Sequence, residues 1–165
     1  MGVRKVLHYP HPCLRAHASE VTEFDGSVLG LAEDLVDTMR AHHRCVGLAA
    51  PQIGEPVRMI AVDVSEHPKT TGFHGLIVLV NPTVTLSAGA EVGREGCLSL
   101  PDITANVRRS TRIRFEAALP DGRRFESMTS GFEARALLHE IDHLDGILIL
   151  DRVASPAEVF ARRQP

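Results

Sequence analysis

The segment ALLHEIDHLDGILIL, residues 136–150, contains two histidines four positions apart in an otherwise mostly apolar stretch. At 100° per residue, His139 and His143 lie about 40° apart around a helix, so both imidazoles can reach one cation. Glu140 lies on the flank, where its carboxylate can stand beside a water without binding the ion. This HExxH spacing predicts a site in which the ion acidifies water and Glu140 carries the proton. A histidine pair without an ion would carry a desolvation penalty here.

The residues around the motif predict the helix that carries it. Ser130 is a candidate N-cap with Glu133 three residues later, the spacing of a capping box. Apolar residues recur at helical spacing and Gly146 stops the pattern; they are Phe132, Ala136, Leu137, Ile141 and Leu144. The HExxH segment is therefore expected on an amphipathic helix with its apolar face in the core.

A catalytic metal centre needs a third protein ligand, which can be a distant Cys, His, Asp or Glu. Among the cysteines, spacing does not choose between Cys13, Cys45 and Cys97. Gly96 favours Cys97, because a glycine beside the thiolate permits close approach of the backbone to a ligand. The alternative for any single cysteine is a small buried apolar residue, and this interpretation suits Cys13.

The rest of the chain reads as one helix and several short strands. Apolar spacing predicts a helix over 27–39, with Asp25 or Ser27 as N-cap. Strands are expected at 57–64, at 76–80 with Asn81-Pro82 ending it, at 83–88 and at 103–108. A hairpin is expected from 111–119 and 123–130 around Pro120-Asp121-Gly122. The predicted fold class is α+β, with short, mostly antiparallel strands around the HExxH helix and a helix near the N-terminus.

Composition bounds the class of protein. The chain has 165 residues and 44% hydrophobic residues, which fits a single domain spanning 1–165. A net charge of −3 argues against sequence-specific nucleic-acid binding. The sparse, odd set of cysteines does not suggest disulfides, and no apolar run is long enough to span a bilayer. A cytoplasmic protein with no membrane partner is expected.

Three stretches, in this order and spacing, resemble the signature motifs of the peptide deformylases. They are VGLAAPQIG at 46–54, EGCLSLP at 95–101 and HEIDHLDG at 139–146. The similarity also covers PHPCLR at 10–15, DVSE at 63–66, VNP at 80–82 and DRV at 151–153, so it spans nearly the whole chain. The resemblance implies an enzyme that removes the formyl group from N-formylmethionine on nascent polypeptides and releases formate.

The resemblance also implies roles for matching residues. Cys97, His139 and His143 would bind one divalent cation, Fe²⁺ in the cell and often Ni²⁺, Co²⁺ or Zn²⁺ in preparations. Glu140 would be the general acid and base, and the Gln52 amide and the Leu98 backbone N–H would bind the oxyanion. Substrate-binding residues would be Val46 and Gly47 for the peptide backbone, with Val46, Phe132 and Ala136 around the methionine side chain.

The chain departs from the family pattern at Cys45, where glycine is usual, and at Leu138, where glutamine is usual. Neither position supplies a ligand. With Cys45, activity is expected to survive with altered substrate affinity, and Leu138 is expected to remove a hydrogen bond beside His139 and so tune the metal modestly. The tail after Asp151 is short, and Ser155-Pro156 predicts a brief helix. A monomer acting near the ribosomal exit tunnel is expected.

The residues leave two alternatives open. In an HExxH endopeptidase the third ligand is normally a His or Glu after the helix, and Glu158 is the only residue of either type after His143. The non-enzyme alternative is a structural metal module, which would want four protein ligands and no open position, or a non-catalytic deformylase-like protein that only binds metal.

Overall fold

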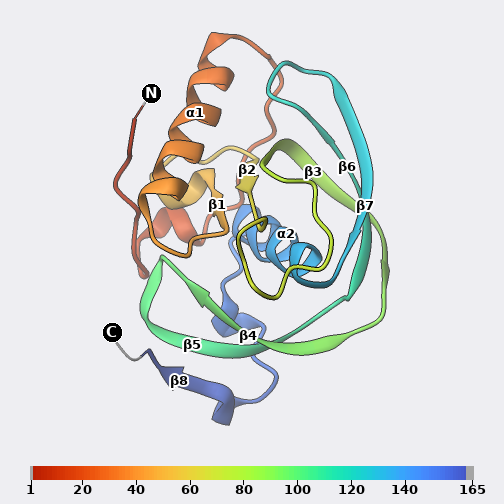
Figure 1. Cartoon of the computed structure of the whole chain (residues 1–165). Helices are drawn as coiled ribbons and strands as arrows, with labels where there is room; N and C mark the ends of the chain where they lie inside the picture. Colours follow the sequence, from red (N-terminus) through yellow and green to blue (C-terminus); the bar gives the residue numbers. More distant parts are fainter. Residues whose placement is uncertain (1, 163–165) are drawn as a thin grey trace.

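The structure is a computed structural model that describes residues 2–162. Its fold is α+β, as predicted (Figure 1). The helices are α1 (Gly26–Ala41) and α2 (Gly131–Leu144), with short 3-10 helices η1 (Pro12–Leu14), η2 (Ala50–Ile53), η3 (Ile149–Asp151) and η4 (Pro156–Glu158). The strands are β1 (Gly47–Ala49), β2 (Met59–Val62), β3 (Ile77–Ala88), β4 (Glu91–Cys97), β5 (Leu100–Arg109), β6 (Arg112–Ala118), β7 (Arg124–Ser130) and β8 (Val159–Ala161).

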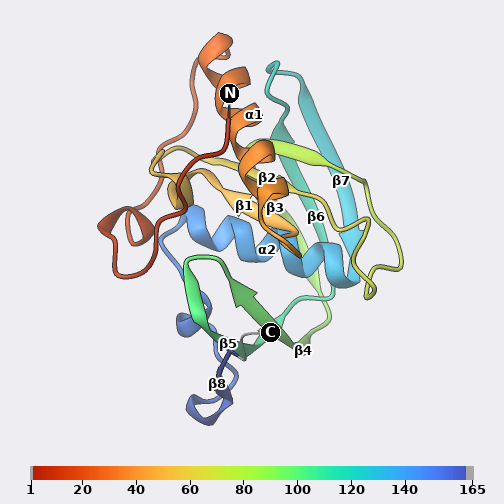
Figure 2. The same ribbon diagram turned by 60° about the vertical axis from the view of Figure 1, so that its left-hand side comes forward.

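The strands form two antiparallel sheets with α2 between them. One sheet has the order β1-β2-β3-β6-β7 and the other the order β4-β5-β8. Figures 1 and 2 both show α2 lying in the middle of the molecule, with the three-stranded sheet on one side and the five-stranded sheet on the other. Helix α1 lies outside the five-stranded sheet, next to β1 and β2. The HExxH helix is therefore the central element of the fold.

Apolar side chains explain this layering. The apolar stripe of α2, including Ala134, Leu137 and Leu144, is fully buried against strand residues such as Ile60 and Phe115. A second core joins α1 to the outer face of the same sheet. A third core lies under β4 and β5 and includes Cys97 itself. Burial of these side chains stabilises the fold and fixes how far α2 stands from β4.

The ends of the helices test the capping predictions. Asp25 is the N-cap of α1 and accepts a hydrogen bond from Ser27 N at 2.9 Å, as predicted. The capping box at α2 is wrong, because Ser130 makes no side-chain capping bond. Glu133 is fully buried and instead accepts hydrogen bonds from His74 N and Thr129 Oγ1, both at 2.7 Å. Ser130 is still the last residue of β7, so the chain passes directly from strand to helix.

The strand predictions at 76–80 and 83–88 merge into one strand, β3, so Asn81-Pro82 does not end it. The pairing of β3 with β6 shifts register between Val80 and Thr83, and Asn81 has a φ of 50°. Asn81 also exchanges two side-chain hydrogen bonds with the backbone of Val21, at 2.8 and 2.9 Å. The Asn-Pro pair therefore marks a bulge inside a strand, where a missing N–H is tolerated.

The remaining elements agree with the sequence in part. The predicted hairpin is β6-β7, and the strands at 57–64 and 103–108 correspond to β2 and β5. The brief helix predicted after Ser155 is η4. Strands β1, β4 and β8 were not predicted. Across residues 2–162, none of the helices combines the length and the apolar character that a bilayer crossing requires.

Candidate metal centre

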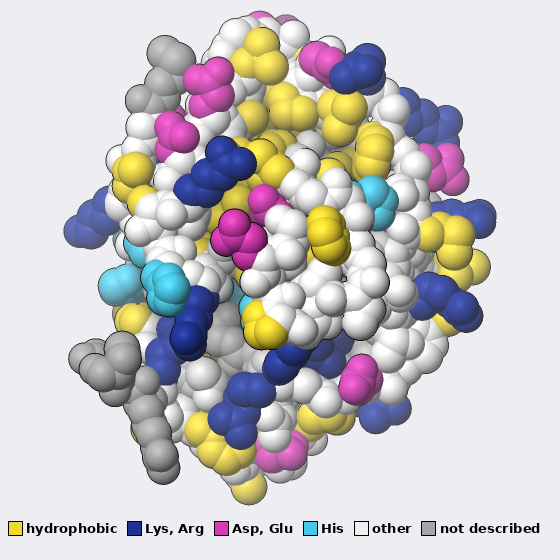
Figure 3. Space-filling model, viewed as in Figure 1, with side chains coloured by type: hydrophobic (Ala, Val, Ile, Leu, Met, Phe, Trp, Pro, Cys, Tyr) yellow, Lys and Arg dark blue, Asp and Glu magenta, His cyan; other side chains and the backbone are white. Residues whose placement is uncertain are grey.

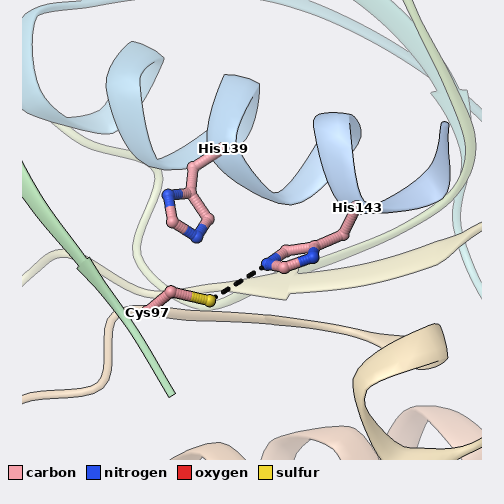
Figure 4. A group of neighbouring side chains, drawn as sticks. All are labelled: Cys97, His139 and His143. Atoms are coloured by element: carbon pink, nitrogen blue, oxygen red, sulfur yellow. Dashed lines mark hydrogen bonds between the residues drawn. The ribbon is translucent and has the colours of Figure 1, made fainter. Parts of the chain in front are cut away.

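The two histidines of the HExxH motif point from one face of α2 toward the end of β4. Figure 4 shows His139, His143 and Cys97 converging on one another. One ligand atom from each residue lies within 4.8 Å of the other two. His143 Nε2 is 3.3 Å from the Cys97 sulfur. One thiolate and two imidazoles can supply the three protein ligands of a catalytic metal site, which keeps its fourth position open.

The other two cysteines take no part in this cluster among the described residues. Cys13 lies in η1 and is half-buried. Cys45 precedes β1, and its thiol donates to the Gly47 carbonyl at 3.1 Å. Burial raises the pKa of the Cys45 thiol to about 12, which disfavours the thiolate that binds metals. The cysteine that lies beside the two histidines is Cys97, the one that the neighbouring Gly96 favours in the sequence.

A buried acid, Glu95, orients the first histidine, and sequence reasoning missed it. Its carboxylate contacts His139 Nδ1 at 2.8 Å, which leaves the ring's Nε2 for the cluster. Arg109 donates to both Glu95 oxygens at 3.0 Å, and Arg135 donates to one of them at 2.7 Å. The sequence does contain a signal for Glu95: it lies two positions before Cys97, and this spacing places both side chains on the same face of a strand.

The buried groups of the cluster shift one another's pKa values. Burial opposes a charged sulfur, but the adjacent His143 and His139 hold the pKa of the Cys97 thiol well below its usual range. Burial likewise opposes a charged His139, while hydrogen bonds to Cys97 and Glu95 hold its pKa well above the usual value. Burial would raise the pKa of Glu95, yet His139 and Arg109 lower it to about 2. The sulfur is therefore held in its ligand form.

Glu140 lies beside the cluster with an unused oxygen. Its side chain is buried, and Oε2 has no hydrogen-bond partner among the described residues. A buried carboxylate oxygen without a partner is costly, so this atom fits a site that is completed by a water or a substrate. Burial raises the pKa of the Glu140 carboxyl, which makes it a better proton acceptor than an exposed carboxylate.

Gln52 reaches the cluster from η2 with its amide held in one orientation. Its Oε1 accepts from Ala49 N at 2.9 Å, so its NH₂ group faces the site. That group donates to Ser99 Oγ at 3.1 Å and lies 3.6 Å from the Cys97 sulfur. A neutral donor fixed beside the sulfur can stabilise negative charge that develops on a substrate oxygen.

A cleft of about 960 Å³ opens onto this centre. Its walls include five of the residues that the sequence associates with substrate or oxyanion, namely Val46, Gly47, Leu98, Phe132 and Ala136. His67, which was not predicted, stacks on the Phe132 ring with centroids 4.0 Å apart.

The third candidate ligand, Cys97, comes from β4, before the HExxH helix in the chain, whereas the endopeptidase alternative requires a third ligand after that helix.

The α+β fold and this cluster define a metal-dependent hydrolase of the HExxH type. A sequence model described as polypeptide deformylase matches residues 3–159. A peptide deformylase from Dictyoglomus thermophilum is 42% identical over 150 residues, which are 91% of this chain and 92% of that protein. The chain belongs to the polypeptide deformylase family, whose members are metal-dependent and remove the formyl group from nascent N-formylmethionyl peptides.

Solved structures agree with this assignment. A peptide deformylase from Legionella pneumophila is 39% identical, with a TM-score of 0.85 over 94% of this chain and 88% of that one. A class I type b peptide deformylase from Acinetobacter baumannii, solved with Met-Ala-Ser bound, is 30% identical, with a TM-score of 0.86 over 92% and 98% of the two chains. The chain is thus an amide hydrolase of this family.

Proposed function

We propose that Cys97, His139 and His143 hold one divalent cation and that Glu140 is the general acid and base for deformylation. The observation that carries this proposal is the buried, unpartnered Oε2 of Glu140 beside three converging ligand atoms. A proton acceptor without a protein partner at that place is suited to an attacking water. The same carboxyl can return the proton to the methionine nitrogen as the formyl C–N bond breaks.

The cation proposed for the cell is Fe²⁺, with Ni²⁺, Co²⁺ or Zn²⁺ able to occupy the same site in preparations. A thiolate with two imidazoles suits all four ions, so availability decides among them. When bound, the ion supplies Lewis-acid chemistry that acidifies water and polarises the formyl carbonyl. The Glu95–His139 contact occupies Nδ1, so Nε2 is the ring nitrogen that would bind the ion.

Two donors are proposed for the formyl oxygen as it gains negative charge. The Gln52 NH₂ group is fixed by Ala49 and Ser99, so it needs no reorganisation during the reaction. Leu98, directly after Cys97, lines the same cleft, and its backbone N–H is the second proposed donor. The removal of one such donor from an amide-hydrolysing site typically costs about 10²–10³ in kcat.

The substrate is proposed to bind as an extended peptide between two sheet edges. Strand β1 is the first strand of one sheet and β4 the first strand of the other, and both line the cleft through Gly47 and Gly96. Free strand edges present the backbone groups to which an extended peptide can bond. Val46, Phe132 and Ala136 are proposed to surround the methionine side chain. The Met-Ala-Ser peptide bound to the Acinetobacter relative supports a peptide of this kind.

The cellular setting is proposed from the substrate. N-formylmethionine stands at the start of chains as they are made, so the enzyme is proposed to act in the cytoplasm, near the ribosomal exit tunnel. It is proposed to act as a monomer whose residues 1–165 form a single catalytic domain, because the chain alone supplies all the proposed ligands, the proton carrier and the cleft.

Formate release from formyl-Met-Ala-Ser, measured together with metal content, tests this proposal. The protein should be reconstituted anaerobically with Fe²⁺, Ni²⁺, Co²⁺ or Zn²⁺ in separate samples. The expected result is one ion per chain, formate release, and no cleavage of internal peptide bonds. Bound metal without formate release would favour the non-catalytic alternative, and internal cleavage would favour the endopeptidase.

The choice of ion has its own test. Ferrous iron beside a thiolate is open to oxidation of the iron or of Cys97, while nickel resists. Activity of the iron form should therefore decay in air, and that of the nickel form should persist. Equal decay of both forms would show that the sensitive group is not the metal–thiolate pair.

A further inference from the structure

Positive charge gathers at the mouth of the cleft, although the chain as a whole is negative. The net charge of the sequence is −3. The residues that line the cleft nevertheless include five Arg or Lys and only two carboxylates, Glu95 and Glu140. Glu95 is already paired with Arg109 and Arg135, and Glu140 is buried. The opening of the cleft is thus electropositive.

Four of these cations carry charge that no carboxylate balances. They are Arg44, Lys69, Arg94 and Arg162, which we call the basic rim. Within residues 2–162, none of the four has a carboxylate oxygen within 4.0 Å. Arg94 is held in place, but by neutral partners: it donates to Asn106 Oδ1 at 2.8 Å and Thr104 Oγ1 at 3.2 Å. All four side chains are exposed and can meet a ligand.

The C-terminal strand β8 delivers one of these cations to the cleft. Pairing of Phe160 with Thr104, and the bond from Arg162 N to the Asp102 carbonyl at 2.8 Å, fix this segment on β5. The Arg162 guanidinium then lies over Gly96, where a Cβ would stand 2.6 Å from its Nη2. The ring of Phe160 lies 3.7 Å from the Arg94 guanidinium carbon. Gly96, which precedes Cys97 in the chain, therefore leaves room for Arg162.

Figure 3 shows Lys and Arg side chains gathered on the lower half of one face, in the region of β4, β5 and β8, with the acidic side chains at the middle of the face lying above them. Two of the rim cations lie at β4, the strand along which the extended substrate is proposed to bind: Arg94 belongs to this strand and Arg162 lies over its Gly96. Successive side chains of an extended peptide are about 3.4 Å apart along its axis, so those just after formylmethionine pass the rim.

We propose that the basic rim, with Arg162 as its specificity-determining residue, selects nascent chains that carry an acidic side chain at the second or third position. This inference rests on the proposed function, since it assigns a substrate class to the same cleft. A guanidinium is suited to carboxylates because its fork of donors matches their two oxygens. Nucleic acid fits the rim less well, because four cations converge on a peptide-sized cleft and do not form a broad basic face.

Matched formyl peptides test the preference. Each pair compares Glu with Gln, at the second position in one pair and at the third in the other, and all peptides are amidated so that no terminal carboxylate interferes. The nickel-loaded enzyme should show a kcat/KM ratio of Glu to Gln of about threefold to tenfold in at least one pair at low salt. The ratio should fall toward one at about 300 mM salt, because exposed charges are screened.

Variants at Arg162 locate the effect. Arg162→Gln should lower the Glu-to-Gln ratio by about threefold, Arg162→Lys should restore part of it, and Arg162→Glu should bring it below one. Arg123→Gln, at an exposed arginine in the turn between β6 and β7, is the matched control and should keep the wild-type ratio. Metal content and thermal unfolding show whether each variant is folded.

Two results would overturn the inference. One is a ratio of one or less in both pairs for the wild type at low salt, a measurement that needs no variant. The other is a Glu-to-Gln ratio in Arg162→Glu that equals the wild-type ratio. If that variant also binds ribosomes more weakly, the basic rim would be assigned to RNA binding. Failure of the proposed function looks different, because then neither peptide of a pair releases formate.

Discussion

Gly47 lies directly against the carboxylate of Glu140. A Cβ at residue 47 would stand 2.7 Å from Oε1 and 2.8 Å from Cγ of Glu140. Real Cβ atoms essentially never show such short separations, so any side chain at 47 must displace the carboxylate. Residue 47 is therefore glycine because Glu140 occupies the space that a side chain would need.

The variant Gly47→Ala should lose activity and keep its metal. Displacement of a catalytic group by about 1 Å can cost roughly 10²-fold in rate, so formate release should fall by about tenfold to a hundredfold. Metal content should not change, since the three atoms nearest to an added methyl group all belong to Glu140 and not to a candidate ligand. Gly30→Ala, where the space is open, is the control. Full activity in Gly47→Ala would mean that Glu140 moves without consequence.

Substitution of Glu95 should loosen the metal without touching a ligand. Because Glu95 orients His139, Glu95→Gln should weaken metal affinity by roughly 10–100-fold. Competition with a chelator measures this. Glu91→Gln, an exposed glutamate at the start of the same strand, should behave as the wild type. Equal affinities in all three proteins would show that the His139 ring is held by other contacts.

The pKa of Glu95 gives the metal-free protein a defined acid sensitivity. The pKa is about 2 in the folded protein against a usual value of 4.5. Because the pKa of Glu95 is lower in the folded than in the unfolded protein, its carboxylate stabilises the fold at pH values above the unfolded-state pKa. This stabilisation is lost as the pH falls from about 4.5 toward 2. The free energy of unfolding of Glu95→Gln should depend less on pH in this window, and be lower at neutral pH by on the order of 3 kcal/mol. Parallel pH curves for variant and wild type would contradict this assignment.

Cys45 lies just before β1, the strand proposed to bind the substrate. Its thiol bonds to the Gly47 carbonyl at 3.1 Å and its side chain packs against the core under α1. Cys45→Gly should remain active, with a KM shifted by a few-fold and a free energy of unfolding lower by about 1 kcal/mol. Cys13→Ala, outside the cleft, is the control. Unchanged KM and stability would mark the cysteine as neutral.

The sequence was sufficient for the centre of the fold because its signals there are local. HExxH has helical spacing, and its ligand geometry follows from helix dimensions alone. The hairpin β6-β7 likewise has an alternating pattern and a Pro-Asp-Gly turn. The candidate ligands, Glu140 and Gln52 lie together, as the family resemblance implied, although the elements that carry Cys97 and Gln52, β4 and η2, were not predicted.

The sequence was insufficient where partners are distant. Strand β8 is three residues long and exists through pairing with β5, so nothing in VFA predicts it. Glu95 has partners that are distant in sequence, including Arg109 and His139, and their convergence depends on how β4 meets α2. Asn81-Pro82 reads as a strand end by local rules, and only contact with Val21 turns it into a bulge.

The most direct test of the account is Glu140→Gln, assayed for metal and for turnover in the same sample, with Cys97→Ala alongside. Glu140→Gln should keep one ion per chain and lose about 10²–10⁴-fold in kcat, because the amide cannot carry the proton. Cys97→Ala should lose the ion itself. Full formate release by metal-loaded Glu140→Gln would contradict the account.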